Sequence, residues 1–192
     1  MSVIYRTTMD PTKGELLAAW MPKQPWFEGD STHSLRVVGG FRLDDPKDKV
    51  GMEMILVLDE TPEIPVLYHV PLSYRGAELD DASGALLGTS AHGILGTRWI
   101  YDAEQDPVWQ TQVKALIAGE VTAQHQNDSH VLDHSITVNL NQGVAAERES
   151  TAAVIRRPVA GGQGTEQARA WITAPLSHTA NNADFGAVIE LL

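Results

Sequence analysis

The sequence predicts an α+β protein in which an antiparallel sheet packs against an N-terminal helix. Segments 35–42, 50–58 and 66–74 alternate apolar and polar residues and are separated only by short turns. Strands joined by short turns pair antiparallel, because a parallel pair needs a long crossover. Segments 15–21 and 106–118 carry apolar residues at helical spacing after capping residues, so each is expected to be a helix.

The N-terminal helix is limited at both ends by local sequence. Segment 10–15 supplies capping residues, and Leu16, Leu17 and Trp20 then fall on one helical face. Proline removes a backbone donor and disfavours helical angles in the residue before it. The helix is therefore expected to end just before Pro22.

The three central strands are expected to form hairpins. The glycine pair at 39–40 interrupts the first strand and indicates a β-bulge, and polar turns lie at 44–49 and 61–65. Pro71 places part of the third strand at an edge or a bulge, because proline cannot donate to a neighbouring strand.

The remainder of the chain carries weaker patterns. Segment 75–96 is rich in Gly, Ala and Ser and is expected to be a loop with a short helical turn. The second helix should begin at Asp106-Pro107 and end at Gly119. Further strands are expected near 136–140, 152–159, 168–174 and 185–192, with a loop at 160–164.

Composition excludes several classes of function. The net charge of −11 disfavours binding to nucleic acid or to anionic lipid, both of which need a basic surface. The absence of cysteine removes disulfides, thiol nucleophiles and zinc–thiolate sites. The first ten residues lack the apolar run of a signal peptide, and we expect a cytoplasmic protein. A neutral sugar or another protein is the expected partner, with no cofactor.

An aromatic turn follows the first helix. Segment 20–29, WMPKQPWFEG, holds two of the five Trp residues, a Phe, two Pro and a Gly. It resembles a segment near the start of the N-terminal cap domain of actinobacterial maltokinases. Two further elements resemble that family in the same order, namely Tyr68-His69-Val70-Pro71-Leu72 and the Tyr101-Asp102-Ala103 run that precedes Asp106-Pro107. The resemblance extends over residues 13–118.

The resemblance implies a curved, cystatin-like antiparallel sheet and a link to trehalose, maltose and α-glucan metabolism. It divides the chain into a cap-like domain, 1–118, and an additional β-rich segment, 119–192, that packs on the same globule. Pro25 replaces an Arg of the family pattern. No kinase catalytic-loop motif is present, so a stand-alone homologue of the cap is expected. Such proteins are sometimes linked to 1,4-α-glucan branching, but the chain is too short for a catalytic (β/α)₈ barrel.

The family-motif positions are the candidate binding residues. Large aromatic side chains dominate core energetics, and they also serve as platforms for sugars and partners. The favoured interpretation is a small core that pins the first helix to the sheet, and the alternative is a partly exposed binding surface. The candidates are Trp20, Pro22, Gln24, Trp26, Phe27, Gly29, Tyr68, Pro71, Asp102 and Asp106.

Four other patterns in the sequence resemble functional motifs, and none predicts a catalytic or metal site. Asp184-Phe185-Gly186 matches a kinase magnesium motif but lacks its partner motifs, so a turn into the last strand is expected. Ser90, His92 and Asp102 could form a triad, but no nucleophile elbow is present. The histidine-rich segment 125–134, with His125, His130, Asp133 and His134, lacks a full ligand set and a general base. Loop 161–164 lacks the Lys and Ser/Thr of a phosphate-binding loop.

Two functions remain open at this point. The first is a non-catalytic accessory or regulatory protein that acts through a protein partner, as a cap covers its kinase. The second is a small-ligand module that binds a sugar on the concave face of the sheet. An enzyme is a third, weaker hypothesis, because no nucleophile–base pair or ligand set can be assembled from the sequence.

Overall fold

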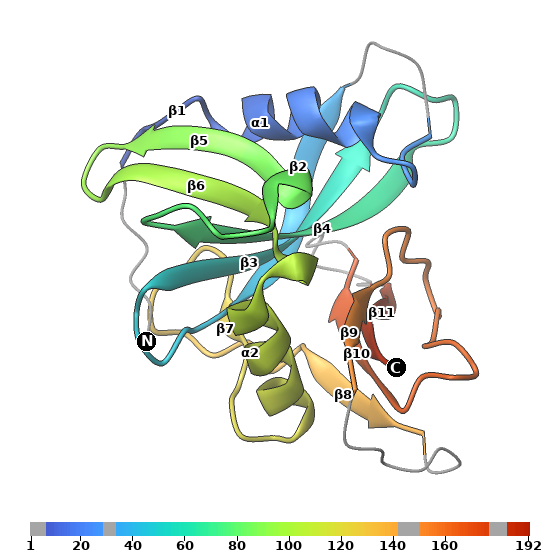
Figure 1. Cartoon of the computed structure of the whole chain (residues 1–192). Helices are drawn as coiled ribbons and strands as arrows, with labels where there is room; N and C mark the ends of the chain where they lie inside the picture. The colour runs from blue at the N-terminus through green and yellow to red at the C-terminus, as the bar shows by residue number, and fades with distance from the viewer. Residues whose placement is uncertain (1–6, 29–33, 142–149, 177–183) are drawn as a thin grey trace.

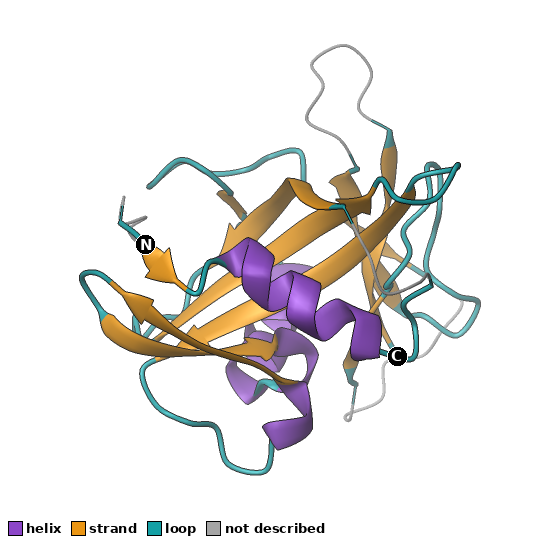
Figure 2. Ribbon diagram, turned by 90° about the horizontal axis from the view of Figure 1, so that it is seen from above, coloured by secondary structure: helices purple, strands orange, loops and turns teal. Residues whose placement is uncertain are grey.

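A seven-stranded antiparallel sheet curls around helix α1 in the computed structural model of the chain (Figures 1 and 2). The structure describes residues 7–28, 34–141, 150–176 and 184–192. The strand order is β1-β5-β6-β4-β3-β2-β7. Along the chain, the strands are β1 Met9–Asp10, β2 Leu35–Leu43, β3 Val50–Asp59, β4 Val66–Arg75, β5 Leu86–His92, β6 Gly96–Asp102 and β7 Gln124–His125.

Helix α1, Lys13–Trp20, forms where the sequence predicts it. Thr12 and Glu15 make a reciprocal capping box, with the Thr12 amide donating to the Glu15 carboxylate at 2.8 Å. The helix passes at Trp20 into a 3₁₀ turn, Met21–Lys23. It contacts both β2 and β5, which three other strands separate in the sheet, so α1 lies on the concave side. The predicted α+β fold with an N-terminal helix is confirmed.

The concave face is filled by the chain's own side chains. Leu16, Leu17 and Trp20 of α1 pack on alternate residues of the central strands. Gly88 of β5 lies beneath the helix, where its φ of +153° favours glycine and a Cβ would lie 2.8 Å from Leu16 Cδ2. The sheet residues on this face are Ile55, Val57, Tyr68, Val70, Leu72 and Ile100, all buried.

The opposite face packs against helix α2 and a second sheet. Helix α2, Pro107–Ile117, begins at the predicted Asp106-Pro107 element and buries Trp109 and Val113 against Met54. The second sheet has the order β8-β10-β11-β9, and all its pairs are antiparallel. Its strands are β8 Thr137–Leu140, β9 Ala152–Val154, β10 Ala170–Pro175 and β11 Phe185–Leu191.

Both sheets contribute to one hydrophobic core. Ile172 and Ile189 of the second sheet are fully buried together with Met54 of β3 and Trp109 of α2. Strand β7 follows α2 in the sequence but pairs with β2 of the first sheet. The core and the β2–β7 pairing thus both cross residue 118. The division of the chain into two domains at this residue stays a prediction.

Three features of the first sheet depart from the sequence analysis. Segment 75–96 was expected to be a loop but contains β5, whose Leu86-Leu87-Gly88-Thr89 sequence has no alternating pattern. Pairing with β6 on one side and β1 on the other forms this strand despite its weak propensity. The predicted short helical turn is present at Ser83–Ala85. Strands β1 and β7, of two residues each, were not predicted.

The predicted β-bulge is present in β2. The β2–β3 register shifts between Val37 and Gly39. Gly40 follows with a φ of +140°, and a Cβ at this position would lie 2.1 Å from the Met54 carbonyl oxygen, so only glycine fits. Within the described ranges, every helix is too short or too polar to cross a lipid bilayer.

Candidate functional site

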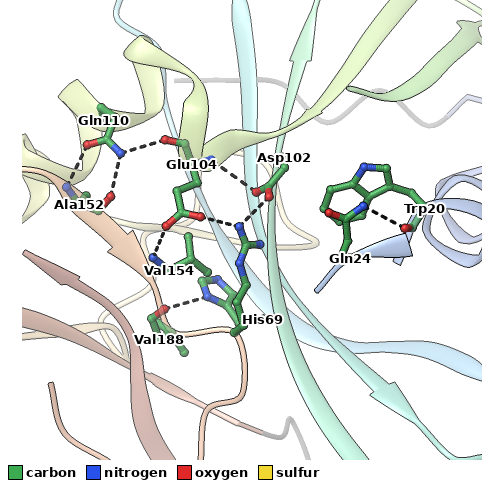
Figure 3. Close-up of polar contacts among 10 residues, drawn as sticks. Trp20, Gln24, His69, Asp102, Glu104, Gln110, Ala152, Val154 and Val188 are labelled. Carbon is green, nitrogen blue, oxygen red and sulfur yellow. Dashed lines mark hydrogen bonds and ion pairs between the residues drawn. The ribbon is translucent and has the colours of Figure 1, made fainter. Parts of the chain in front are cut away.

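Arg156 lies where the second sheet meets the first, at the centre of a buried polar cluster. It follows β9, and its Nη2 donates to Asp102 Oδ2 and to Glu104 Oε2, both at 2.6 Å (Figure 3). The Arg156 and Asp102 side chains are only 12% and 10% exposed. We name Arg156, Asp102, Glu104, His69 and Gln110 the Arg156 cluster.

The two carboxylates of the cluster come from the end of β6. Asp102 is its last residue and caps the 3₁₀ turn Ala103–Gln105, which places Glu104 beside it. Burial raises the pKa of Asp102 above its ordinary value, although the Arg156 guanidinium acts in the opposite direction. One buried cation therefore binds two carboxylates, of which Asp102 is 10% exposed and Glu104 is 33% exposed. Removal of that cation would leave the Asp102 carboxylate buried without a counter-charge.

The aromatic turn covers the guanidinium of Arg156. The Trp26 ring lies 5.0 Å from the Arg156 Cζ atom, a geometry that gives a cation–π interaction. Trp26 also contacts Trp20 and Tyr68, each with ring centroids 5.8 Å apart, and Phe27 stacks on Tyr68 at 5.0 Å. The four aromatic residues singled out in the sequence thus form one cluster between α1 and the second sheet.

Hydrogen bonds join the aromatic turn to β4 and to the end of α1. The Glu28 amide donates to the Tyr68 hydroxyl at 3.1 Å, and Gln24 Nε2 donates to the Trp20 carbonyl at 3.2 Å. Burial raises the pKa of Tyr68 above its ordinary value. These contacts favour the interpretation of the turn as a small core. The Gln24 amide group and the Glu28 backbone amide both donate to groups of the chain itself.

His69 was not predicted as a site residue and lies at the base of the cluster. It follows Tyr68 on β4, so strand alternation turns it to the opposite face of the sheet. Its ring Nδ1 lies 2.9 Å from the Val188 carbonyl oxygen of β11, and its amide donates to the Arg156 carbonyl. Burial, together with the nearby Arg156 charge, lowers the pKa of His69 to about 3. The ring is therefore neutral near neutral pH, with the proton on Nδ1 and a lone pair on Nε2.

Gln110 and Glu104 bind the outer edge of β9. Gln110 Oε1 accepts from the Ala152 amide at 2.9 Å, and its Nε2 donates to the Ala152 carbonyl at 2.8 Å. Glu104 Oε1 accepts from the Val154 amide at 2.8 Å (Figure 3). The two side chains thus take the place of a neighbouring strand, which protects this edge from pairing with another chain.

Asp106 lies outside the Arg156 cluster and has a structural role of its own. Its carboxylate accepts two hydrogen bonds from the Arg75 guanidinium, at 2.7 and 2.6 Å, and caps α2 through the Val108 amide at 2.9 Å. Burial would raise the pKa of Asp106, but the hydrogen bonds from Arg75 and Val108 outweigh it and the pKa is lowered.

Replacement of Asp106 with alanine should lower the free energy of unfolding by about 3 kcal/mol, since it removes a helix cap and leaves Arg75 without its partner. Urea denaturation at neutral pH measures this loss. Because the folded-state pKa is lowered, the contribution is present above the ordinary Asp pKa and decreases as pH falls through the folded value. Asp106→Asn keeps a capping oxygen and should lose less stability, with a weaker dependence on acid. Equal losses in the two variants would contradict this account.

The remaining motif positions are not brought together into a binding surface. Pro22 is exposed in the 3₁₀ turn after α1. Pro71 is buried in β4 opposite Met54, one residue before the stretch that β6 pairs, which fits its missing amide. Gly29 lies outside the described residues. Trp26, Tyr68 and Asp102 converge near Arg156, whereas Asp106 binds Arg75.

The weighed triad does not assemble. Ser90 donates to the Pro11 carbonyl at 2.7 Å, and His92 Nδ1 accepts from the amides of its own hairpin turn. Ser90 pairs with Arg98, whereas Asp102 lies four residues further along β6, about 13 Å away at the usual rise of a strand.

The other weighed patterns also have structural roles. The structure describes all of segment 125–134 with its three histidines. In the part of the chain that it describes, no three His, Asp or Glu residues are placed to hold a metal. Loop 161–164 packs on β11, where the Ala187 amide donates to the Gly162 carbonyl. Asp184 precedes β11, as expected for a turn into the last strand.

The comparison with known families identifies the part of the chain that carries these motifs. Residues 20–106 match the model of the maltokinase N-terminal cap domain. This stretch is a homologue of that cap domain. No curated protein matches the chain. The cap homologue runs from the end of α1 to the capping residue of α2, so it contains all ten predicted motif positions and excludes Arg156 and the second sheet.

The cap homologue therefore directs its characteristic side chains toward another part of the same chain. Trp26 and Asp102, from the two ends of the match, both contact Arg156. The local sequence around Arg156 predicts only a strand over 152–159 and does not indicate this role. In chemical terms the arrangement is a fixed ion-pair network that fastens the second sheet to the cap homologue.

Proposed function

We propose that this protein is a non-catalytic accessory or regulatory protein that binds an enzyme of trehalose, maltose or α-glucan metabolism. The observation that carries the proposal is the burial of the cap motif against the second sheet through Trp26, Asp102 and Arg156. These contacts hold the motif side chains within the chain, so a partner would bind elsewhere on the protein. An acidic composition without cysteine suits a cytoplasmic location.

The roles of the polar side chains support a non-catalytic function. Asp102 and Asp106 each bind an arginine and cap a helical turn, and Ser90 binds a backbone carbonyl. Neutral His69, with a pKa of about 3, donates to a backbone carbonyl rather than to another reactive group. A general acid or base needs a pKa close to the working pH, and His69 is far from that range.

A protein partner is favoured over a sugar on the concave face. Leu16, Leu17 and Trp20 already occupy that face, and each of them is buried. A sugar could enter there only if α1 moved away, which would expose the apolar residues beneath it and cost several kcal/mol.

The proposal can be tested with a maltokinase from which the cap domain has been deleted. We expect the present protein to form a complex with the kinase domain in sedimentation velocity and to change its kcat/KM for maltose phosphorylation. The matched control is the kinase mixed with the Arg156→Ala variant, which loses the ion pairs between the second sheet and the cap homologue. Turnover of maltose and ATP by the protein alone would overturn the non-catalytic assignment. Absence of any complex with this kinase, or with other enzymes of the pathway, would remove the accessory role.

A further inference from the structure

The outer side of β2 is paired along only part of its length. Strand β2 spans Leu35–Leu43 and pairs with β3 along most of its inner side. On the outer side, β7 pairs only with Phe41 and Arg42. Among the described residues, no hydrogen bond joins the backbone of residues 35–39 to any segment other than β3. We call residues 35–39 the free half of β2.

The backbone groups that face outward can be assigned from the pairing pattern. The Glu60 amide donates to the Ser34 carbonyl, so Ser34 directs its backbone groups toward the β3 side. Along an antiparallel strand, successive residues direct their backbone amide and carbonyl groups alternately toward one side of the strand and the other. Leu35 and Val37 therefore direct their amide and carbonyl groups toward the open side, where an added strand would bond to them.

A cleft of about 480 Å³ lies beside the free half of β2. Its two walls are Val37, Val38 and Gly39 of β2 and His125, Gln126 and Asn127 after β7. The volume lies within the range of pockets that hold ligands in proteins. Val37 is 38% exposed, so an apolar side chain from another molecule could contact it within this cleft.

The edge of β9 in the second sheet differs from the free half of β2. The edge of β9 is covered by Gln110 and Glu104, which bond to its amide and carbonyl groups. Residues 35–39, Leu-Arg-Val-Val-Gly, include no Lys and no Pro, the residues that commonly block an edge strand. The β-bulge shifts the register within the free half, yet the outward groups of Leu35 and Val37 have no partner strand in the part of the chain that the structure describes.

We propose that the free half of β2 binds an extended, basic segment of a partner protein, which adds to the sheet as a further strand. Backbone hydrogen bonds to Leu35 and Val37 would supply affinity, and the cleft would accept an apolar side chain. Charge favours a basic segment, because the chain carries −11 and two exposed carboxylates, Glu60 and Asp128, flank the free half. Glu60 already pairs with Arg36 of the free half, and Asp128 lies 2.9 Å from His125 Nδ1, so the excess negative charge is that of the whole chain. This proposal rests on the proposed function in one respect, namely that the partner is a protein.

The probe is a blocked peptide of alternating valine and threonine with a lysine at each end. We expect its addition to slow amide hydrogen exchange at Leu35 and Val37 of the intact protein, followed by NMR. A control peptide with the same valine and threonine residues, but with glutamate in place of each lysine, should bind more weakly. Slowed exchange at other strands, or no binding of the basic peptide at millimolar concentration, would overturn the proposal.

Val37→Pro is the matching change on the protein. It removes the outward amide without removing a bond to β3, and an extended edge position tolerates proline. We expect affinity for the peptide to fall about tenfold, as for the loss of one good hydrogen bond. Val37→Thr keeps the amide and should bind as the wild type does. Equal binding by the Pro and Thr variants would count against strand addition, and the exchange measurement on the wild-type protein remains decisive if the Pro variant does not fold.

The two proposals fail separately. Peptide binding at β2 with no complex formed by any pathway enzyme would remove the accessory function and leave strand addition in place. A complex with the kinase that Val37→Pro does not weaken would keep the accessory function and remove β2 as its surface.

Discussion

Replacing Arg156 with alanine is expected to lower the free energy of unfolding by about 4 kcal/mol at neutral pH. Breaking a buried ion pair by removing one partner costs about 3–5 kcal/mol, because the other charge stays buried without compensation. Here Asp102 and Glu104 both lose the cation that neutralises them, and Trp26 loses its cation–π contact. The measurement is urea denaturation followed by tryptophan fluorescence.

The adjacent arginine provides a matched control. Arg157 pairs with Glu28, but these side chains are 46% and 63% exposed. Exposed ion pairs contribute about 0–1 kcal/mol, so Arg157→Ala should change stability by no more than that. Losses of similar size in the two variants would contradict a specific role for the Arg156 cluster.

The pH dependence of the Arg156→Ala effect follows from Asp102. Burial already raises its folded-state pKa, and removal of the cation should raise it further. A raised folded pKa contributes stability at low pH that is lost as pH rises through the folded value. The destabilisation by Arg156→Ala should therefore become smaller in acid, where Asp102 is protonated. A destabilisation that is constant between neutral and acidic pH would show that packing, not charge, dominates.

The second large effect is expected from pH alone and involves His69. Its folded pKa is about 3, whereas an exposed His titrates near 6.5. The unfolded chain therefore binds a proton that the folded chain rejects, and stability decreases as pH falls from the unfolded value toward the folded one. The full loss is roughly 5 kcal/mol, at 1.36 kcal/mol for each unit of pKa difference.

His69→Gln should remove most of this acid sensitivity. Glutamine can donate to the Val188 carbonyl as the ring does, but it does not titrate. We expect the variant to be less stable than the wild type at pH 7, because the ring fills its site better, and to lose less stability between about pH 6.5 and pH 4. His134→Gln, at an exposed position, serves as the control. A variant and wild type with parallel pH profiles would exclude His69 as the group responsible.

These two predictions involve residues that the sequence did not mark. Arg156 sits in a segment predicted as a strand from 152 to 159, but β9 ends at Val154 and the chain then turns toward β4. Only the pairing of β4 and β6 brings Asp102 within reach of Arg156, more than fifty positions later in the chain. Contacts of this kind depend on strand order, which local pattern does not encode.

Local pattern was sufficient where one element carries its own signal. The capping box of Thr12 and Glu15 and the proline at position 22 limit α1, and Asp106-Pro107 begins α2 as expected. The apolar pattern located β3 and β4 to within a residue. Both strands are rich in apolar residues because one face is buried against α1 and the other against α2 or the second sheet. The aromatic turn was also expected to pack as a small core, as the structure places it.

Tertiary structure decided the rest, for two physical reasons. Strand β5 has little intrinsic preference for an extended chain and forms because β1 and β6 satisfy its backbone, so its existence depends on its neighbours. The sequence singles out Asp102 through the family motif, but it does not indicate that Glu104 and Arg156 are its neighbours. They become a buried network only when the second sheet docks on the first, because burial in a low-dielectric interior makes the ion pair and the neutral state of His69 energetically significant.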